Sequence, residues 1–184
     1  LRRERRAPLA WPSRRAAQAN VEAACLPSAM KLTAFTDYSL RVLIYLAAQP
    51  ERRATIAEIA ASFAVSEHHL TKVVHFLGKH GWLANVRGKG GGLSLAKAPD
   101  AINIGEVVCQ TEGGAIVECF GEGGGECRIT GLCRLRGVLG EAVAAFHAVL
   151  RRYTLADLVS NREALAAIFF VDKAPARRPP KEAP

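Results

Sequence analysis

The chain has 184 residues, 49% of them hydrophobic, and it carries a formal net charge of +8. That length is sufficient for one or two compact units with a real hydrophobic core, and it excludes a larger multidomain protein. No stretch of the sequence approaches the roughly 18 consecutive apolar residues of a membrane-spanning helix. Five cysteines, an odd number without a hydrophobic signal sequence, argue against a secreted disulfide framework, so we expect a soluble cytoplasmic protein with reduced thiols.

The positive charge is concentrated in parts of the chain. Residues 1–29 carry six Arg and two Glu, and residues 66–97 carry five Lys or Arg against one acidic residue, Glu67. Residues 98–140 have the opposite balance, with three Arg and six acidic side chains. A local basic window of this kind favours a polyanionic partner such as nucleic acid.

Both ends of the chain differ in composition from its middle. Residues 1–29 are rich in Arg, Ala and Pro without a sustained hydrophobic period, and the single methionine, Met30, follows them. We predict a disordered leader upstream of a true start at Met30, with a transit peptide as the alternative because the stretch is Arg-rich and acid-poor. Residues 171–184, rich in proline and charge, are predicted to form a disordered tail.

The apolar spacing predicts three helices, over residues 35–50, 55–65 and 67–81. Thr36 is the predicted cap of the first helix, and Thr55 with Glu58 has capping-box spacing at the start of the second. Ser66 is a natural N-cap for the third helix, which Gly81 ends. Two short helices joined by a tight turn are the helix-turn-helix pattern.

Two short strands are predicted next, over residues 82–87 and 93–96, joined by the glycine-rich segment 88–92. A strand pair of this kind is a wing. Residues 30–100 are therefore predicted to form a winged helix-turn-helix DNA-binding domain.

Residues 101–170 are predicted to hold a cysteine loop and dimerisation helices in a mainly α fold. A short helix is expected over residues 102–113, with Asn103 as its N-cap. A long amphipathic helix follows over residues 135–153, and a second copy of this helix is the natural cover for its apolar stripe. A last short helix is expected over residues 154–159.

The exposed face of the third helix and the wing provide the predicted DNA contacts. A recognition helix packs one face in the core and presents the other to the major groove. Thr71 and Lys72 suit phosphate contact, and His68 and His69 stand early enough in the helix to reach bases. Cations among the wing glycines can enter a minor groove. The full predicted set is Ser66, His68, His69, Thr71, Lys72, His75, Arg87, Gly88, Lys89 and Gly90. The alternative is that these are ordinary solvated positions.

Three cysteines, Cys119, Cys127 and Cys133, are separated by seven and five residues in a glycine-rich loop. Glycine-rich loops with thiolates suit iron-sulfur clusters. A zinc site or a thiol sensor is the first alternative, although the CxxC pairs typical of zinc sites are absent. The second alternative is a loop that holds no site. Cys109 is predicted to lie on the apolar face of its helix, in the hydrophobic core, and Cys25 lies in the predicted leader.

Several segments carry a resemblance to a known family: "MKLTAFTDYSLRVLIYLA", "VSEHHLTKVVHFL", "VRGKGGGLSLAK", "CRITGLCRL" and "YTLADLV". Together they resemble the NsrR nitric-oxide-sensing repressors of the Rrf-two superfamily of winged-helix regulators, whose relatives include the iron-sulfur biogenesis regulator IscR and the iron-responsive regulator RirA. The resemblance covers residues 30 to about 170.

The resemblance implies a homodimer crossed by the long helix, a palindromic operator, and a cluster bound by the three loop cysteines, with 4Fe-4S favoured over 2Fe-2S. IscR-type members use a histidine three residues after the last cysteine, where this chain has Arg136. NsrR-type members use an aspartate of the first helix, and Asp37 stands at the matching place. A charge that stabilises the helix N-terminus is the alternative role of Asp37.

The sequence leaves two alternatives for the signal that the regulator senses, nitric oxide and iron. The seven-residue spacing between Cys119 and Cys127 departs from the five that the resemblance leads us to expect and is closer to RirA-like members, so iron is the alternative to nitric oxide. A zinc- or thiol-based redox regulator is the other alternative. The sequence shows no constellation of catalytic acids and bases, and the wing argues against an electron carrier, so we expect a nucleoid-associated regulator rather than an enzyme.

Overall fold

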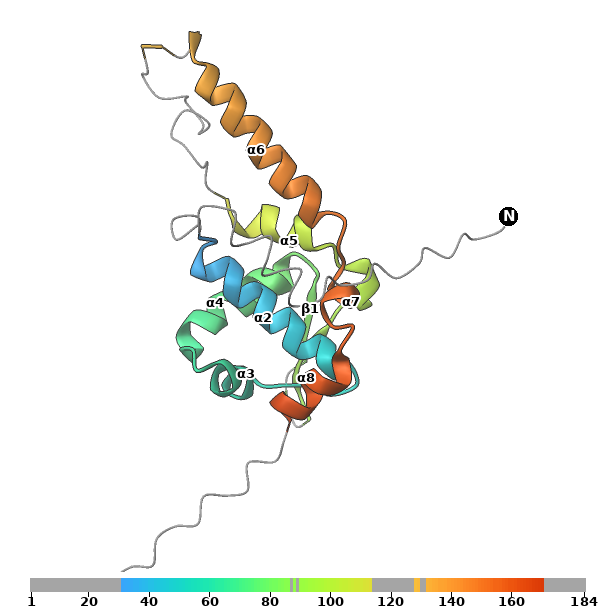
Figure 1. Cartoon of the computed structure of the whole chain (residues 1–184). Coiled ribbons are helices and arrows are strands. Elements are labelled where there is room, and N and C mark those ends of the chain that lie inside the picture. The colour runs from blue at the N-terminus through green and yellow to red at the C-terminus, as the bar shows by residue number, and fades with distance from the viewer. Residues whose placement is uncertain (1–30, 87, 89, 114–127, 130–131, 171–184) are drawn as a thin grey trace, which may run out of the picture. The chain divides into compact units, whose positions relative to one another are not determined.

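The structure, a computed structural model, describes residues 31–86, 88, 90–113, 128–129 and 132–170. Its elements, in chain order, are α2 (Ala34–Ala48), α3 (Ile56–Phe63), α4 (Glu67–Lys79), β1 (Leu83–Val86), β2 (Gly92–Leu95), the 3-10 turn η1 (Pro99–Ala101), α5 (Ile104–Thr111), α6 (Arg134–Leu150), α7 (Leu155–Leu158) and α8 (Arg162–Phe169) (Figure 1). The predicted leader and tail lie outside the described residues. Within those residues, no helix is long and apolar enough to cross a membrane. The mainly helical fold with one small hairpin confirms the predicted fold class.

Helix α2 begins at Ala34, two residues before its predicted cap. Its N-cap is Thr33, whose side chain accepts a hydrogen bond of 3.2 Å from the Thr36 backbone N–H. The prediction that Thr36 caps the helix is therefore wrong, since Thr36 lies inside the first turn and is fully buried. Either threonine satisfies the residue preference of an N-cap, so only tertiary burial distinguishes them.

Helices α3 and α4 form the predicted helix-turn-helix. The capping box between Thr55 and Glu58 is present at the start of α3, and Ala64 ends this helix in the left-handed conformation with φ 53°. Ser66 occupies the N-cap of α4 as predicted, although its side chain makes no capping hydrogen bond. The chain leaves α4 through Gly81, whose φ of +71° suits glycine.

Strands β1 and β2 form the predicted antiparallel hairpin, with Val86 opposite Gly92 at its tip end. Ala54, between α2 and α3, pairs with Leu93 of β2 through two backbone hydrogen bonds of 2.8 and 3.0 Å. Ala54 and Leu93 are both buried, so the hairpin is fixed to the body at Leu93, one residue from the Val86–Gly92 pair.

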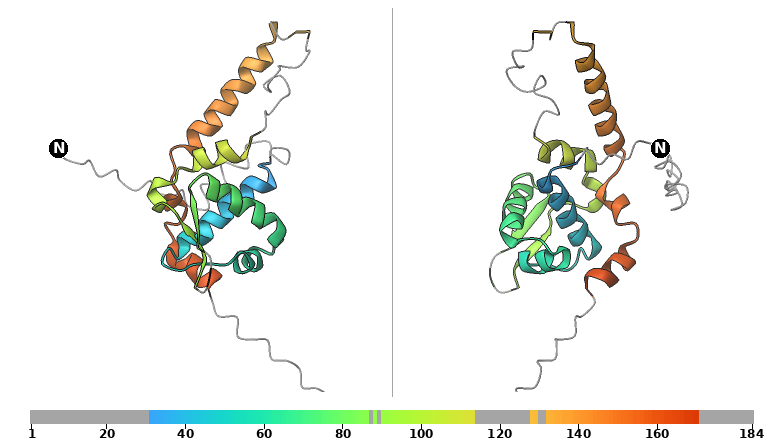
Figure 2. Two further views of the ribbon diagram at one scale, coloured as in Figure 1. Left: turned by 180° about the vertical axis from the view of Figure 1, so that it is seen from behind. Right: turned by 60° about the vertical axis from the view of Figure 1, so that its left-hand side comes forward.

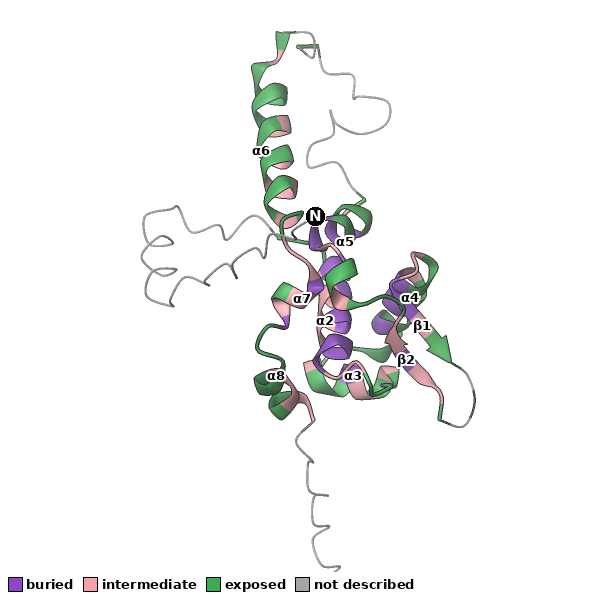
Figure 3. Ribbon diagram, turned by 90° about the vertical axis from the view of Figure 1, so that its right-hand side faces the viewer, coloured by how far each residue is buried: buried purple, intermediate pink, exposed green. Residues whose placement is uncertain are grey.

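One hydrophobic core unites the winged helix with α5 and α7. Leu43 of α2 and Leu77 of α4 are fully buried in the same cluster as Val107 of α5 and Leu155 of α7. Figure 3 shows the buried residues gathered on these helices. The Leu155 N–H also donates to the Ile102 carbonyl at 2.8 Å, which ties α7 to the start of α5.

Helix α6 confirms the predicted long helix, but none of its residues is buried. Phe146 and Leu150, near its C-terminal end, pack against the core, and the rest of the helix extends away from the other elements (Figures 1 and 2). Large apolar side chains along it are exposed, including Leu135 (62%) and Val138 (62%). The predicted apolar stripe is therefore open to solvent in the single chain.

Helix α8 is an addition to the predicted elements, the last of which ends at residue 159. Phe169 and Phe170 pack on Tyr45 of α2, with ring centroids 5.2 and 5.0 Å away, and Phe169 also lies 5.3 Å from Phe63 of α3. This aromatic cluster holds α8 against the first two helices.

Candidate nucleic-acid interface and cluster ligands

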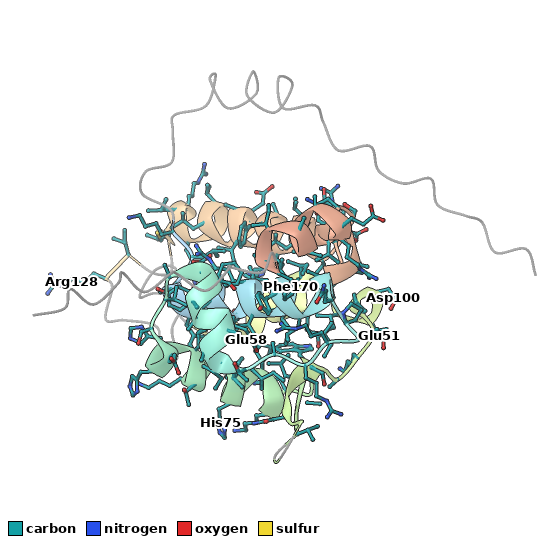
Figure 4. The ribbon with its side chains drawn as sticks, turned by 90° about the horizontal axis from the view of Figure 1, so that it is seen from below. Glu51, Glu58, His75, Asp100, Arg128 and Phe170 are labelled. Atoms are coloured by element: carbon teal, nitrogen blue, oxygen red, sulfur yellow. The ribbon has the colours of Figure 1, made fainter. Side chains whose placement is uncertain are left out.

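Helix α4 has one buried and one exposed face, as expected of a recognition helix. Its buried residues are Leu70, Val73, Val74 and Leu77. The exposed residues, with the cap, are Ser66, Glu67, His68, His69, Thr71, Lys72, His75, Gly78 and Lys79. Figure 4 shows His75 pointing away from the core at the edge where the hairpin also projects. Every predicted contact residue of α4 is thus accessible to DNA.

Thr71 is less suited to phosphate contact than the sequence suggested. Its hydroxyl donates a hydrogen bond of 2.8 Å to the Glu67 carbonyl, one turn back in the same helix. A hydroxyl has a single hydrogen to donate, and a phosphate accepts rather than donates. Thr71 would have to release the Glu67 carbonyl before it could donate to a phosphate.

The start of α2 packs directly on the recognition helix. Phe35 makes an edge-to-face contact with Phe76 at a centroid distance of 5.2 Å, and Tyr38 stacks on His69 at 6.4 Å with an interplanar angle of 27°. These two contacts lie on either side of Asp37 in the chain. A displacement of the first turn of α2 would therefore act on α4.

The tip of the wing depends on glycine. Gly88 and Gly90 have φ of +97° and +76°, values that residues with a side chain rarely adopt. The Gly91 N–H donates to the Gly88 carbonyl at 2.9 Å and closes a turn. The two predicted wing cations, Arg87 and Lys89, lie outside the described residues.

Asp37 lies in the first turn of α2 and is bound by Arg41, four residues later. Arg41 Nε donates to Asp37 Oδ1 at 3.0 Å, and Arg41 Nη2 lies 2.8 Å from Asp37 Oδ2. Both side chains are partly exposed, at 44% and 42%. Exposed ion pairs contribute only about 0–1 kcal/mol, so a metal ion can compete with Arg41 for this carboxylate.

A hydrogen-bond network, buried at Thr36 and Thr111 and exposed at Thr33, fixes this turn of α2 to the end of α5. The Thr36 hydroxyl donates to Thr111 Oγ1 at 2.9 Å, and the Thr33 N–H donates to Glu112 Oε1 at 2.6 Å. Residue 112 lies directly before the segment that carries Cys119. The network therefore holds the turn of Asp37 beside the point where the cysteine segment begins.

Of the three loop cysteines, only Cys133 is within the described residues, while Cys119 and Cys127 lie outside them. Cys133 is the half-exposed N-cap of α6. The thiolate is the form of cysteine that binds metal. No group of three or more His, Cys, Asp or Glu able to hold a metal ion occurs among the residues that are described.

The prediction that Cys109 lies in the core is wrong, because its side chain is exposed on α5. Val107 and Val108 face the core, and each further residue of a helix turns by about 100°, which carries position 109 to the outer face. Cys109 lines a surface groove together with Glu106 and Arg151.

Three residues with clear structural roles near these sites were not among the predicted site residues: Tyr38, Arg41 and Arg53, whose Nη1 donates a hydrogen bond of 3.0 Å to the Gly90 carbonyl of the wing. The spacing of Asp37 and Arg41 by four residues was a usable signal, because side chains at that spacing meet on a helix. Tyr38 and Arg53 have partners far along the chain, so no local pattern could reveal them.

A helix-turn-helix whose second helix exposes histidine and lysine side chains beside a glycine-tipped hairpin defines a winged-helix DNA-binding protein. The chain belongs to the Rrf2 family, because the family model, described as an iron-dependent transcriptional regulator, matches residues 32–161. It is thus a DNA-binding transcriptional regulator of this family.

The comparisons with individual proteins agree with this assignment. The chain is 49% identical over 141 residues to the HTH-type transcriptional regulator NsrR of Shouchella clausii, which covers 76% of this chain and 95% of that protein. It is 51% identical over 136 residues to the NsrR regulator of Bacillus subtilis, with coverage of 73% and 93%. The solved structure of T. potens IscR has the same fold, with a TM-score of 0.60 and 24% identity over 74% of this chain and 90% of that one. The resemblance to NsrR regulators is therefore confirmed, and these relatives are named as regulators rather than enzymes.

Proposed function

We propose that the protein is a repressor that binds a palindromic operator as a homodimer in the cytoplasm and senses nitric oxide through an iron-sulfur cluster. The observation that carries the proposal is the combination of about 50% identity to regulators named NsrR with three cysteines in one glycine-rich loop. Neither part alone would be sufficient, because a shared fold does not by itself fix function.

In this proposal the cluster ligands are Cys119, Cys127, Cys133 and Asp37. Three thiolates and one carboxylate would form a donor set that suits an iron-sulfur cluster, with one iron held weakly by a hard oxygen ligand. The resemblance to NsrR regulators favours 4Fe-4S over 2Fe-2S. The half-exposed position of Cys133 and the exchangeable partner of Asp37 support this assignment. A bound cluster would supply iron that nitric oxide can bind.

Asp37 is the residue that would link this site to DNA binding. Its carboxylate has two alternative partners, a metal and Arg41, and release from one favours pairing with the other. Phe35 and Tyr38, on either side of it, contact Phe76 and His69 of the recognition helix at 5.2 and 6.4 Å. Exchange of the Asp37 partner would therefore move the first turn of α2 against α4. The first turn of α2 would then be an element with two states, as a conformational switch requires.

The proposed dimer uses α6. Its exposed apolar side chains, Leu135 and Val138 among them, would be covered by the same helix of a second copy. A twofold axis then presents two recognition helices to successive major grooves about 34 Å apart. Val138→Glu should give a monomer in size-exclusion chromatography with light scattering, and a variant that stays dimeric contradicts the use of this helix.

The decisive experiment is an anaerobic titration of the full-length protein. We expect a straw-brown protein whose visible absorbance is bleached by nitric oxide as its affinity for operator DNA falls. Asp37→Ala should change both the spectrum and the reaction with nitric oxide, whereas Asp100→Ala, which removes an exposed carboxylate from η1, should change neither. A colourless protein with stoichiometric zinc contradicts the cluster, and an unchanged Asp37→Ala protein contradicts the fourth ligand.

A second candidate is an iron-responsive regulator that uses the same ligands. The seven-residue spacing between Cys119 and Cys127 favours it. Parallel titration with an iron chelator separates the two signals: release of DNA by chelator, with no response to nitric oxide, identifies iron. A protein that responds only to peroxide or to zinc removal is instead a thiol- or zinc-based regulator.

A further inference from the structure

Two consecutive arginines between α2 and α3 send their side chains to different places. Arg52 pairs with Glu58 of the α3 capping box and lies over the ring of Phe170, 5.0 Å from its centroid. Arg53 instead reaches the wing, where its Nη1 donates a hydrogen bond of 3.0 Å to the Gly90 carbonyl. The neighbouring side chains thus carry the same charge but serve separate parts of the molecule.

The backbone makes this reach possible. Ala54, the next residue, is fixed to Leu93 of β2 by hydrogen bonds of 2.8 and 3.0 Å. Gly92 faces the same segment, and a Cβ at that position would lie 3.1 Å from both Arg53 Cβ and the Ala54 carbonyl oxygen. Glycine at position 92 therefore leaves the room in which the stem of Arg53 runs toward the wing tip.

The wing tip needs an anchor because it is rich in glycine. Four of the five residues over 88–92 are glycines, and each has more conformational freedom to lose than any other residue. The bond from the Gly91 N–H to the Gly88 carbonyl closes the turn but does not attach it to the body. Among the hydrogen bonds of the described residues, the one from Arg53 to Gly90 makes that attachment.

We propose that Arg53 is a positioning residue for DNA binding: it holds the wing tip through the Gly90 carbonyl and so orients the wing before DNA arrives. Ordering the tip in the free protein removes an entropic cost from the binding step. The guanidinium suits the task, because it is planar, stays charged and has five N–H donors. The proposal rests on winged-helix DNA binding alone and is independent of the cluster and its signal.

The test measures DNA affinity by fluorescence anisotropy, with the anaerobically purified full-length protein and a labelled duplex selected from a randomised pool. Loss of one charge-assisted hydrogen bond at the surface should weaken binding by about 3- to 10-fold in Arg53→Ala. Arg52→Ala removes the same charge one residue away and should change affinity by less than about 2-fold. Equal losses in the two variants would assign the effect to net charge and overturn the proposal, as would unchanged binding by Arg53→Ala.

A wing-neutralised background, Arg87→Ala with Lys89→Ala, separates positioning from direct phosphate contact. If Arg53 acts through the wing, adding Arg53→Ala to this background should have no further effect. The same fold loss in both backgrounds means that Arg53 binds phosphate itself and overturns the proposal. In hydroxyl-radical footprints, Arg53→Ala should lose protection where the wing contacts DNA and keep it in the major groove. Equal loss at both places would indicate a general structural defect and also overturn the proposal.

Discussion

The hydrogen-bond network between α2 and α5 allows a quantitative prediction for Thr36→Val. The Thr36 side chain is fully buried, and its hydroxyl lies 2.9 Å from Thr111 Oγ1 and 3.1 Å from Thr33 Oγ1. Valine has nearly the same shape and loses both interactions. Buried hydrogen bonds between neutral groups contribute about 0.5–1.5 kcal/mol each, so the variant should lose about 1–2 kcal/mol of unfolding free energy.

The assay is urea unfolding followed by far-ultraviolet circular dichroism, with thermal unfolding as a second measurement. A loss of that size should lower the melting temperature by about 3–6 °C for a chain of this length. Thr111→Val and the double variant complete a cycle, in which the two residues should show a coupling energy of about 1 kcal/mol. Thr71→Val is the matched control, because Thr71, like Thr111, donates to a carbonyl one turn back but is exposed.

Two results would refute this reasoning. A Thr36→Val protein as stable as the wild type would show that the hydrogen bonds of the buried hydroxyl add nothing to the free energy of unfolding. A coupling energy of zero between Thr36 and Thr111 would show that the 2.9 Å contact does not hold α2 to α5.

Three further predictions concern other parts of the fold. Although burial acts to raise it, the pKa of Glu58 lies below its ordinary value of 4.5 because the capping hydrogen bonds and Arg52 outweigh burial. The stability that Glu58 adds over Glu58→Gln should therefore be present at pH 7 and disappear as the pH falls below about 4, as measured by urea unfolding across pH. Gly92→Ala places a Cβ 3.1 Å from backbone at a φ of +144°, so it should weaken DNA binding in anisotropy titrations while the core unfolds at nearly the same temperature. Phe169→Ala should lower the unfolding free energy by about 2–3 kcal/mol, because its ring packs in the aromatic cluster, whereas Ile168→Ala, 74% exposed, should change it by less than about 0.5 kcal/mol.

The sequence predicted the elements whose signals are local. The helix-turn-helix, the hairpin and the long helix were found from apolar spacing, and the capping box at Thr55 was found from residues three apart. The exposed face of α4 was predicted as the side of the helix opposite the apolar residues that were assigned to the core. These features depend on contacts between near neighbours, so the amino-acid order is enough to indicate them.

The site was only partly predictable, for a physical reason. Asp37 and Cys133 could be proposed from the sequence through a family resemblance, but the partner of Asp37, and the hydrogen bonds that hold its turn to α5, depend on how distant segments pack.

The amino-acid sequence by itself determined the order of the elements and the side of each helix that is apolar, because both follow from the periods of the backbone. Only the tertiary structure decided which threonine is buried at the start of α2, on which face Cys109 lies, and how α8 packs on the aromatic cluster. It also decided that Arg53, rather than Arg52, reaches the wing. Each of these outcomes is set by contacts between residues far apart in the chain, and such contacts leave no period or spacing that a single sequence can show.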